Sequence, residues 1–359
     1  MENIDKLLNY LKNRSIEAYL CINIENSNRS ESFYFSGFTG SLSALIIDSK
    51  NKHIITDSRY YEQAIKETEY ELIKLDRNKG DLIDLVDKQI KKYKKIGINY
   101  SKTSYKVLNG LISRNEKIQF VDVEKIISEI RSVKSDDEIE KIKKSVEIAQ
   151  KALIEALNYL KPGITEKQFV ARLEYEMKNL GSERPAFIPP IVASGYRSAM
   201  PHGRASDKII EYGELVVIDF GAVYEGYCSD ITRTVAVGEI SDEAYRIYEI
   251  VERAQREALN KMKAGMTGKE IDALARNIIE KAGYGYAFGH SLGHGIGVDG
   301  HEAPVLSPRN TEEIRNNVVV TVEPGIYLLG KFGVRIEDDV LLTDRGAVLL
   351  SKQDELIII

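Results

Sequence analysis

Two pairs of well-separated carboxylates stand out in two strongly β-prone stretches of this 359-residue sequence, residues 215–238 and 318–342. The first stretch carries Asp219 and Asp230, and the second carries Glu323 and Glu337. Acidic side chains that share one face of a sheet repel each other, and two such pairs close together would be costly without a cation between them. The four carboxylates therefore indicate a cation site.

The spacing of these carboxylates also suggests how each stretch folds. If each forms an antiparallel hairpin, a turn between Tyr224 and Glu225, beside Gly226, places Asp219 opposite Asp230. A turn centred on Gly330 places Glu323 opposite Glu337 in the same way. We therefore expect each pair to face each other directly.

Four of the chain's five histidines accompany the acidic stretches. The glycine-rich segment 284–304 contains His290, His294 and His301, and the proline-rich segment 185–206 contains His202. Imidazole and carboxylate groups together are typical of metal centres and of acid–base chemistry. A single histidine is more often a satisfied core residue, but this clustering favours a functional site.

Four carboxylates and one imidazole form a hard, oxygen-rich donor set. Such a set suits Mn²⁺, Fe²⁺, Co²⁺ or a pair of Zn²⁺ ions better than a single structural zinc. Four negative charges match two divalent ions. Two ions ~3.5–4 Å apart can share a hydroxide and polarise a carbonyl, so the chemistry indicated is metal-assisted hydrolysis.

We expect pairs of helices to position the two acidic β-prone stretches. A capping box at Ser135 and Glu138 opens a long amphipathic helix, and a second one at Thr165 and Gln168 opens another helix that runs to Gly181. Residues 147–165 align without a gap on residues 249–267, and ten of the nineteen positions are identical. We infer an internal duplication of a unit made of two helices and a β-hairpin.

The preceding residues alternate short β-type runs with amphipathic stretches, which predicts a separate α/β domain. The expected strands cover residues 18–24, 43–48, 53–57, 71–75 and 95–99. We expect domains at 1–132 and 133–359.

Composition excludes several classes of protein. A net charge of −5 without a tail of one sign argues against nucleic-acid and anionic membrane partners, and no stretch has the apolar length of a membrane span or signal peptide. Cys21 and Cys228 belong to no metal or disulfide pattern. We therefore expect a cytoplasmic protein.

The sequence resembles the Xaa-Pro aminopeptidases and Xaa-Pro dipeptidases (prolidases) of the pita-bread metallopeptidase family M24. In the second domain the similar segments are SGYRSAMPHGRAS, DITRT, GHSLGHGIGVDGHEAP, VEPGIY and VRIEDDV, in the family's order. FSGFTGS, TDSRYYEQA and IRSVKSDDEIEKIKKS resemble the accessory domain and the junction. The resemblance implies an α/β N-terminal domain followed by an α+β pita-bread (creatinase/aminopeptidase-like) catalytic domain.

The resemblance also implies roles for individual residues. It makes the metal ligands Asp219, Asp230, His294, Glu323 and Glu337. It places around the scissile carbonyl His202, His290 and His301, where imidazoles can stabilise charge in the transition state. Glu323 would also carry a proton to the leaving nitrogen, and Arg335 would orient a ligand carboxylate. We expect two divalent ions, Mn²⁺ first, with Co²⁺, Zn²⁺ or Fe²⁺ as alternatives.

Two tyrosines need separate comment. Tyr196 stands where many family members have proline, which affects the loop near the substrate rather than the metal chemistry. Tyr327 follows VEPGI and is a candidate substrate-binding residue.

Three functions compete at this point. An Xaa-Pro exopeptidase requires both the ligands and the accessory domain, and both are present. A methionine aminopeptidase-like exopeptidase would share the ligands but lacks the PHGRAS-type loop and the accessory domain. A noncatalytic peptide-binding module should have lost ligands. We expect short proline-containing peptides as substrates and a homodimer in which the accessory domain limits substrate length, while the choice between aminopeptidase and dipeptidase stays open.

Overall fold

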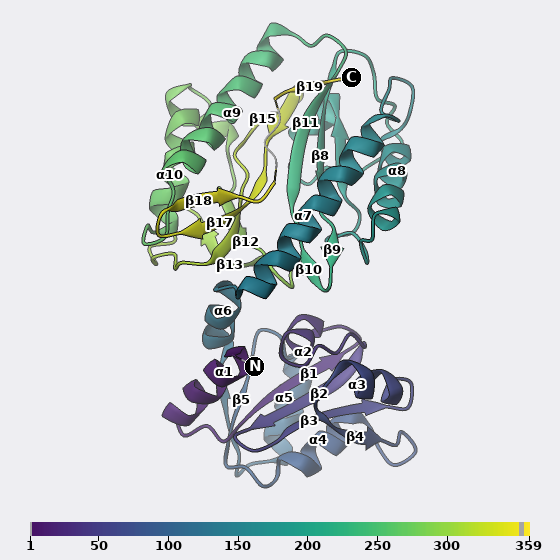
Figure 1. The fold of residues 1–359 in the computed structure, drawn as a ribbon, viewed down its shortest axis with the longest axis vertical. Coiled ribbons are helices and arrows are strands. Elements are labelled where there is room, and N and C mark those ends of the chain that lie inside the picture. The colour runs from purple at the N-terminus through teal and green to yellow at the C-terminus, as the bar shows by residue number, and fades with distance from the viewer. Residues whose placement is uncertain (1, 352–354) are drawn as a thin grey trace. The chain divides into compact units, whose positions relative to one another are not determined.

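The computed structural model describes residues 2–351 and 355–359 and divides into two compact units (Figure 1). The first unit comprises residues Met1–Ile130, and the second comprises residues Arg131–Ile359. The helix α6 (Glu124–Ser132) contains the boundary between them.

The first unit is built on a six-stranded mixed sheet in the order β4-β3-β2-β1-β5-β6. Its strands are β1 (Ala18–Ile24), β2 (Leu42–Asp48), β3 (Lys52–Asp57), β4 (Glu71–Leu75), β5 (Lys95–Ile98) and β6 (Gln119–Asp122). The predicted α/β class and the five predicted strands are confirmed to within one residue at each end. Strand β6 was missed because it is only four residues long and its side chains are half-buried or exposed.

Helices cover both faces of this sheet. They are α1 (Glu2–Asn13), α2 (Arg29–Ser36), α3 (Tyr61–Glu67), α4 (Leu82–Ile90) and α5 (Tyr105–Arg114). Side chains alternate along β1, so Tyr19 and Cys21 join the core formed with α1, α2 and α3. Leu20 and Ile22 join the core formed with α4 and α5 on the other face.

Two pairs of helices flank the strands of the second unit. In Figure 1 these strands lie between the pair α7–α8 and the pair α9–α10. The helices are α7 (Asp136–Leu157), α8 (Glu166–Asn179), α9 (Asp242–Lys261) and α10 (Gly268–Lys281). The predicted capping boxes at Ser135 and Thr165 are present. Helices α8 and α10 both have 14 residues, and their first residues, 166 and 268, differ by the 102 positions of the aligned repeat. This agreement supports the duplication.

The strands of the second unit form two main sheets and two hairpin ribbons. The orders are β19-β11-β8-β7, β13-β12-β14-β17-β18, β10-β9 and β15-β16. The bounds are β7 (Ile191–Ser194), β8 (Glu214–Phe220), β9 (Val223–Tyr224), β10 (Tyr227–Cys228), β11 (Ile231–Val237), β12 (Gly293–Gly295), β13 (Glu302–Leu306), β14 (Val318–Val322), β15 (Gly325–Leu328), β16 (Phe332–Arg335), β17 (Asp338–Thr343), β18 (Gly346–Leu349) and β19 (Ile357–Ile358). Short 3-10 helices cover Gly195–Ala199 and Gly285–Ala287.

The predicted register of the first acidic hairpin is wrong by two residues. Asp219 pairs with Thr232, not with Asp230. The turn is formed by Glu225 and Gly226, which both have positive φ, as a two-residue type I′ turn requires. Asp230 is therefore the diagonal neighbour of Asp219 on the same face of the sheet, and the two carboxylates still converge.

The predicted register of the second hairpin is confirmed. Gly325 pairs with Arg335, so the turn centres on Gly330, which has φ +77°. Glu323 and Glu337 lie where the ladder is interrupted between β14–β17 and β15–β16. Glu323 and Glu337 therefore lie at the same position along the hairpin, between its two paired segments.

The core of the second unit lies between its strands and α9 and α10. Apolar residues of α9, including Ile247, Val251 and Ala254, are fully buried against β14 and β15 residues such as Val322 and Ile326. Among the described residues, no helix combines the length and apolar character needed to cross a membrane.

Candidate metal centre

The second unit brings together five side chains from five places in the chain. Asp219 lies on β8, His294 lies on β12, and three acidic residues lie at strand ends: Asp230, Glu323 and Glu337. Their ligand atoms form overlapping groups that each lie within 4.8 Å: Asp219–Asp230–Glu337 and His294–Glu323–Glu337. The five positions expected to be ligands therefore form one cluster.

His294 joins the acidic residues of both hairpins. Its Nε2 lies 3.4 Å from Oε1 of Glu323 and 3.8 Å from Oδ2 of Asp230. Its Nδ1 lies 3.0 Å from the carbonyl oxygen of Gly295, and an Nδ1–H donated there leaves the Nε2 lone pair free for a cation. The ring of His301 stacks on His294 at a centroid distance of 3.8 Å. His301 also falls within 4.8 Å of Asp230 and His294, so it borders the centre directly.

The carboxylates of the cluster destabilise one another when no cation is bound. Burial, followed by the charges of Glu337 and Asp219, raises the pKa of Asp230 well above its usual range. Burial and the charge of Glu323 do the same to the pKa of Glu337. Burial also raises the pKa of Glu323 to about 8, opposed by Arg335 and reinforced by Asp219. A bound divalent cation would favour the ionised carboxylates and so remove this destabilisation.

The donor set fits divalent ions. Oδ1 of Asp219 is buried and has no hydrogen-bond partner, although buried carboxylate oxygens are nearly always satisfied. Burial lowers the pKa of His294 to about 4, so the imidazole is neutral and able to ligate at neutral pH. The residues that would hold the ions are Asp219, Asp230, His294, Glu323 and Glu337.

A second layer of polar side chains orients these carboxylates. Oγ1 of Thr232 donates to Oε2 of Glu337 at 2.6 Å and accepts from Nε of Arg335 at 3.1 Å. Arg335 also donates to Oδ2 of Asp219. The backbone N–H of Asp230 donates to Oδ2 of the buried Asp339 at 2.9 Å. These hydrogen bonds hold in place the carboxylates of Glu337 and Asp219 and the backbone of Asp230.

Sequence reasoning missed Thr232 and Asp339. Thr232 becomes visible as a partner of Glu337 only through the contact between the two hairpins, which no local pattern reveals. Asp339 lies within the VRIEDDV segment that supported the family resemblance, but it was given no role.

Tyr327 connects Arg335 and His290. Its hydroxyl lies 3.0 Å from NH1 of Arg335 and 3.0 Å from Nε2 of His290. Nδ1 of His290 lies 2.8 Å from the carbonyl oxygen of Ser291, so both ring nitrogens of His290 are engaged. To contact a substrate directly, His290 must release the hydroxyl of Tyr327. The alternative is that His290 acts on the substrate through that hydroxyl.

Two glycines allow the strand that carries His294 to pack closely. A Cβ added at Gly293 would lie 1.9 Å from the carbonyl oxygen of Thr321, and one added at Gly295 would lie 2.2 Å from that of Ala303. Neither contact is possible for a real side chain. The glycines on either side of His294 thus bring the imidazole to the acidic residues.

A cavity of about 730 Å³ opens onto the cluster. Its polar lining includes His202, Arg204, His290, His301 and Tyr327, and its apolar lining includes Phe187, Ile188, Pro189, Ile191 and Val305. The structure therefore places all the predicted site residues around one cavity. Tyr196 is half-exposed and does not line it.

Comparisons with known proteins agree with this description. The model of "Metallopeptidase family M24" matches residues 140–344, and that of "Creatinase/Prolidase N-terminal domain" matches residues 3–133. The Xaa-Pro dipeptidase of Pyrococcus furiosus is 39% identical over 355 residues, which cover 98% of each chain.

Solved structures are similar over the full length. An X-Pro aminopeptidase from Thermotoga maritima has a TM-score of 0.91 and 46% identity, with 99% of each chain covered. An Xaa-Pro dipeptidase from Bacillus anthracis has a TM-score of 0.92 and 42% identity, with 100% of this chain and 99% of the other covered.

Proposed function

Because the chain belongs to metallopeptidase family M24, we propose that it is a metal-dependent exopeptidase that hydrolyses the bond between an N-terminal residue and proline. The observation that carries this proposal is the cluster of four carboxylates and one imidazole at a cavity lined by further histidines. The names of the similar proteins, Xaa-Pro dipeptidase and X-Pro aminopeptidase, supply the substrate class.

The chain's own residues divide the work of hydrolysis. Divalent ions held by Asp219, Asp230, His294, Glu323 and Glu337 would supply an activated water and polarise the scissile carbonyl. Glu323 accepts the proton of the attacking water and delivers it to the leaving proline nitrogen. His301 and His202 face the same cavity and donate to the oxygen on which charge develops, while His290 and Tyr327 form a bonded pair beside them. Arg335 keeps the Asp219 carboxylate in its ligating orientation.

The finer assignments rest on general chemistry. We propose two ions, because four clustered carboxylates balance two divalent charges, and Mn²⁺ as the metal, because oxygen-rich donor sets suit it. The apolar residues Phe187, Ile188 and Val305 would pack against the proline ring. We also propose a homodimer and a cytoplasmic location, the latter because Cys21 and Cys228 are both free and buried.

A substrate series tests the function. The metal-loaded protein is assayed on an Xaa-Pro dipeptide, the matching Xaa-Pro-Xaa tripeptide and the matching Xaa-Ala peptides. We expect proline-dependent cleavage in at least one length class. Equal cleavage of Xaa-Ala and Xaa-Pro would contradict the proposed specificity, and the ratio between dipeptide and tripeptide decides between a dipeptidase and an aminopeptidase.

A further inference from the structure

Glu166 is a fully buried carboxylate outside the metal cluster, at 0% exposure. It is the first residue of α8, directly after the capping residue Thr165. A buried carboxylate is costly unless its oxygens accept several hydrogen bonds or face a positive charge. Glu166 meets both conditions, and every partner comes from one segment of the chain, residues 194–206.

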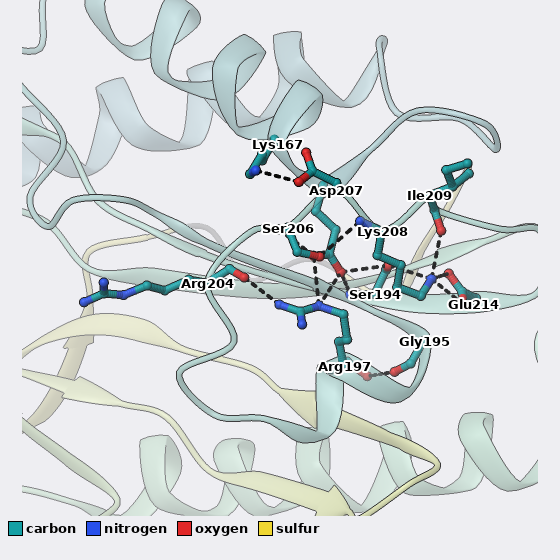
Figure 2. Close-up of polar contacts among 12 residues, drawn as sticks. Lys167, Ser194, Gly195, Arg197, Arg204, Ser206, Asp207, Lys208, Ile209 and Glu214 are labelled. Carbon is teal, nitrogen blue, oxygen red and sulfur yellow. Dashed lines mark hydrogen bonds and ion pairs between the residues drawn. The ribbon is translucent and has the colours of Figure 1, made fainter.

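The two oxygens of Glu166 bind opposite ends of that segment. Oε1 accepts from the backbone N of Ser194 at 2.8 Å and from its hydroxyl at 3.0 Å. Oε2 accepts from the backbone N of Ser206 at 2.9 Å and from its hydroxyl at 2.7 Å. The carboxylate therefore closes the base of a loop whose ends are 12 positions apart. Figure 2 shows Ser194 and Ser206 near each other at the base of this loop.

Arg197 connects Glu166 to a further point in the loop. Its Nε lies 3.1 and 3.3 Å from the two oxygens of Glu166, and its NH2 donates to the carbonyl oxygen of Arg204 at 2.6 Å. In Figure 2 the Arg204 side chain extends away from this network while its carbonyl group points into it. The neighbouring cation, Lys208, is held by Glu214 and by the hydroxyl of Ser194.

The loop closed in this way carries functional groups into the active-site cavity. His202 and Arg204 both line it. On the cavity side, NH1 of Arg335 donates to the carbonyl oxygen of Pro201 at 3.0 Å. Glu166 and Arg335 thus both hold the loop that carries His202.

We propose that Glu166 is a positioning residue that holds the 194–206 loop closed, so that His202 meets the substrate in the orientation needed for catalysis. This inference rests on the proposed function, because His202 acts on the scissile peptide bond. Among the described residues that line the active-site cavity, Glu166 itself is absent.

The substitution Glu166→Gln tests the proposal with little change in volume. One oxygen becomes an amide NH2 that faces the donors of Ser194 or Ser206, and the ion pair with Arg197 is lost. We expect unchanged metal content and a loss of about 10–100-fold in kcat/KM, mainly in kcat, because misplacement of a catalytic group by about 1 Å can cost this much. The matched control is Glu176→Gln, which removes a buried carboxylate of the same helix paired with Arg172 and not with the loop.

A double-substitution cycle separates positioning from a general structural role. If the effect passes through His202, Glu166→Gln should cost almost nothing further in a His202→Ala background. A full additional loss in that background, or wild-type kcat/KM in Glu166→Gln itself, would overturn the proposal. If Glu166→Gln does not fold, Arg197→Gln decides the question, because that side chain is 18% exposed and the substitution removes the bridge to Arg204.

Amide hydrogen exchange of residues 195–206 in the metal-loaded protein gives a readout that does not depend on activity. We expect faster exchange in Glu166→Gln than in wild type or Glu176→Gln. Unchanged exchange would refute the closure. A wild-type protein that cleaves no Xaa-Pro peptide would instead refute the proposed function, and the exchange comparison would still show whether Glu166 closes the loop.

Discussion

At the scale of single residues, the hydrogen bonds of each histidine separate those that can bind metal from those that can serve the substrate. His294 has Nδ1 beside a backbone carbonyl and Nε2 beside two carboxylates, which is the arrangement of a ligand. His290 has both nitrogens engaged, one of them by Tyr327. His301 is stacked on His294 and has solvent access. The spacing of the three histidines within one glycine-rich segment does not predict these contacts, and only the family resemblance had separated His294 from His290 and His301.

We predict that His301→Ala keeps its metal but loses about 10²–10³-fold in kcat, the typical effect of removing one donor to a developing oxyanion. The measurements are metal content by elemental analysis and steady-state kinetics on the preferred Xaa-Pro peptide. His294→Ala serves as the comparison and should lose metal and activity together. Weak metal binding by His301→Ala would instead make His301 a ligand, as its distance to Asp230 permits.

Thr232 gives a second prediction at this scale. Thr232→Val preserves shape but removes the hydroxyl that donates to Glu337 and accepts from Arg335. We expect a 10–100-fold (order-of-magnitude) weaker metal affinity, because partners that orient a ligand typically contribute this much. Competition with a chelator measures it. Thr232→Ser keeps the hydroxyl and should restore most of the metal affinity. Equal metal affinity in wild type, Thr232→Val and Thr232→Ser would show that the Thr232 hydroxyl does not orient the ligand Glu337.

At the scale of elements, local patterns predicted most of the fold. The strands of the first unit and the capping boxes of α7 and α8 were predictable because each depends on residues close together in sequence. The register of the first hairpin was not, because we assumed that Asp219 must face Asp230 directly. The turn residues decide instead: positive φ at Glu225 and Gly226 sets the register, and the diagonal neighbours still share a face.

A buried ion-pair group illustrates what the sequence could not reveal at this scale. The side chain of Glu302, next to His301, contacts Arg131 and lies 3.2 Å from Nζ of Lys134. Burial alone would raise the pKa of Glu302, but the charges of Arg131 and Lys134 outweigh it and lower the pKa to about 2. The partners are more than 160 positions apart in sequence, as the separation of 168 between Lys134 and Glu302 shows.

This group predicts a dependence of stability on pH. Because the folded state lowers the pKa of Glu302, its contribution is fully present above the ordinary glutamate pKa, near 4.5, and is lost as pH falls toward about 2. Glu302→Gln should cost about 3–5 kcal/mol at pH 7, the typical effect of breaking a buried pair. Urea unfolding from pH 7 down to pH 3 should show the two proteins converging.

The control for this prediction is Glu140→Gln, which removes an exposed carboxylate paired with Lys143 on α7. It should change stability by less than about 1 kcal/mol at every pH. A constant difference between wild type and Glu302→Gln across the pH range would contradict the assigned role of Glu302.

At the scale of the whole molecule, the family, the two-unit architecture and the substrate class follow from residues in one chain. We propose that substrate length and assembly depend on surfaces that meet only when chains associate. We predict that the 359-residue protein sediments as a homodimer, in which the accessory domain of one subunit lies over the active site of the other and limits peptide length. Analytical ultracentrifugation over a range of concentrations measures this. A monomer at all concentrations, with strict selectivity for short peptides, would contradict the dimer.

The central claim is that the cluster of carboxylates and His294 binds two divalent ions that make the protein an Xaa-Pro peptidase. The most direct test titrates the metal-stripped protein with Mn²⁺ while release of the N-terminal residue from the preferred Xaa-Pro peptide is measured. The account predicts no hydrolysis without metal and activity that levels off at about two ions per chain, as a dinuclear centre requires. Full release of the N-terminal residue by the metal-stripped protein, or no release at any metal concentration, would contradict it.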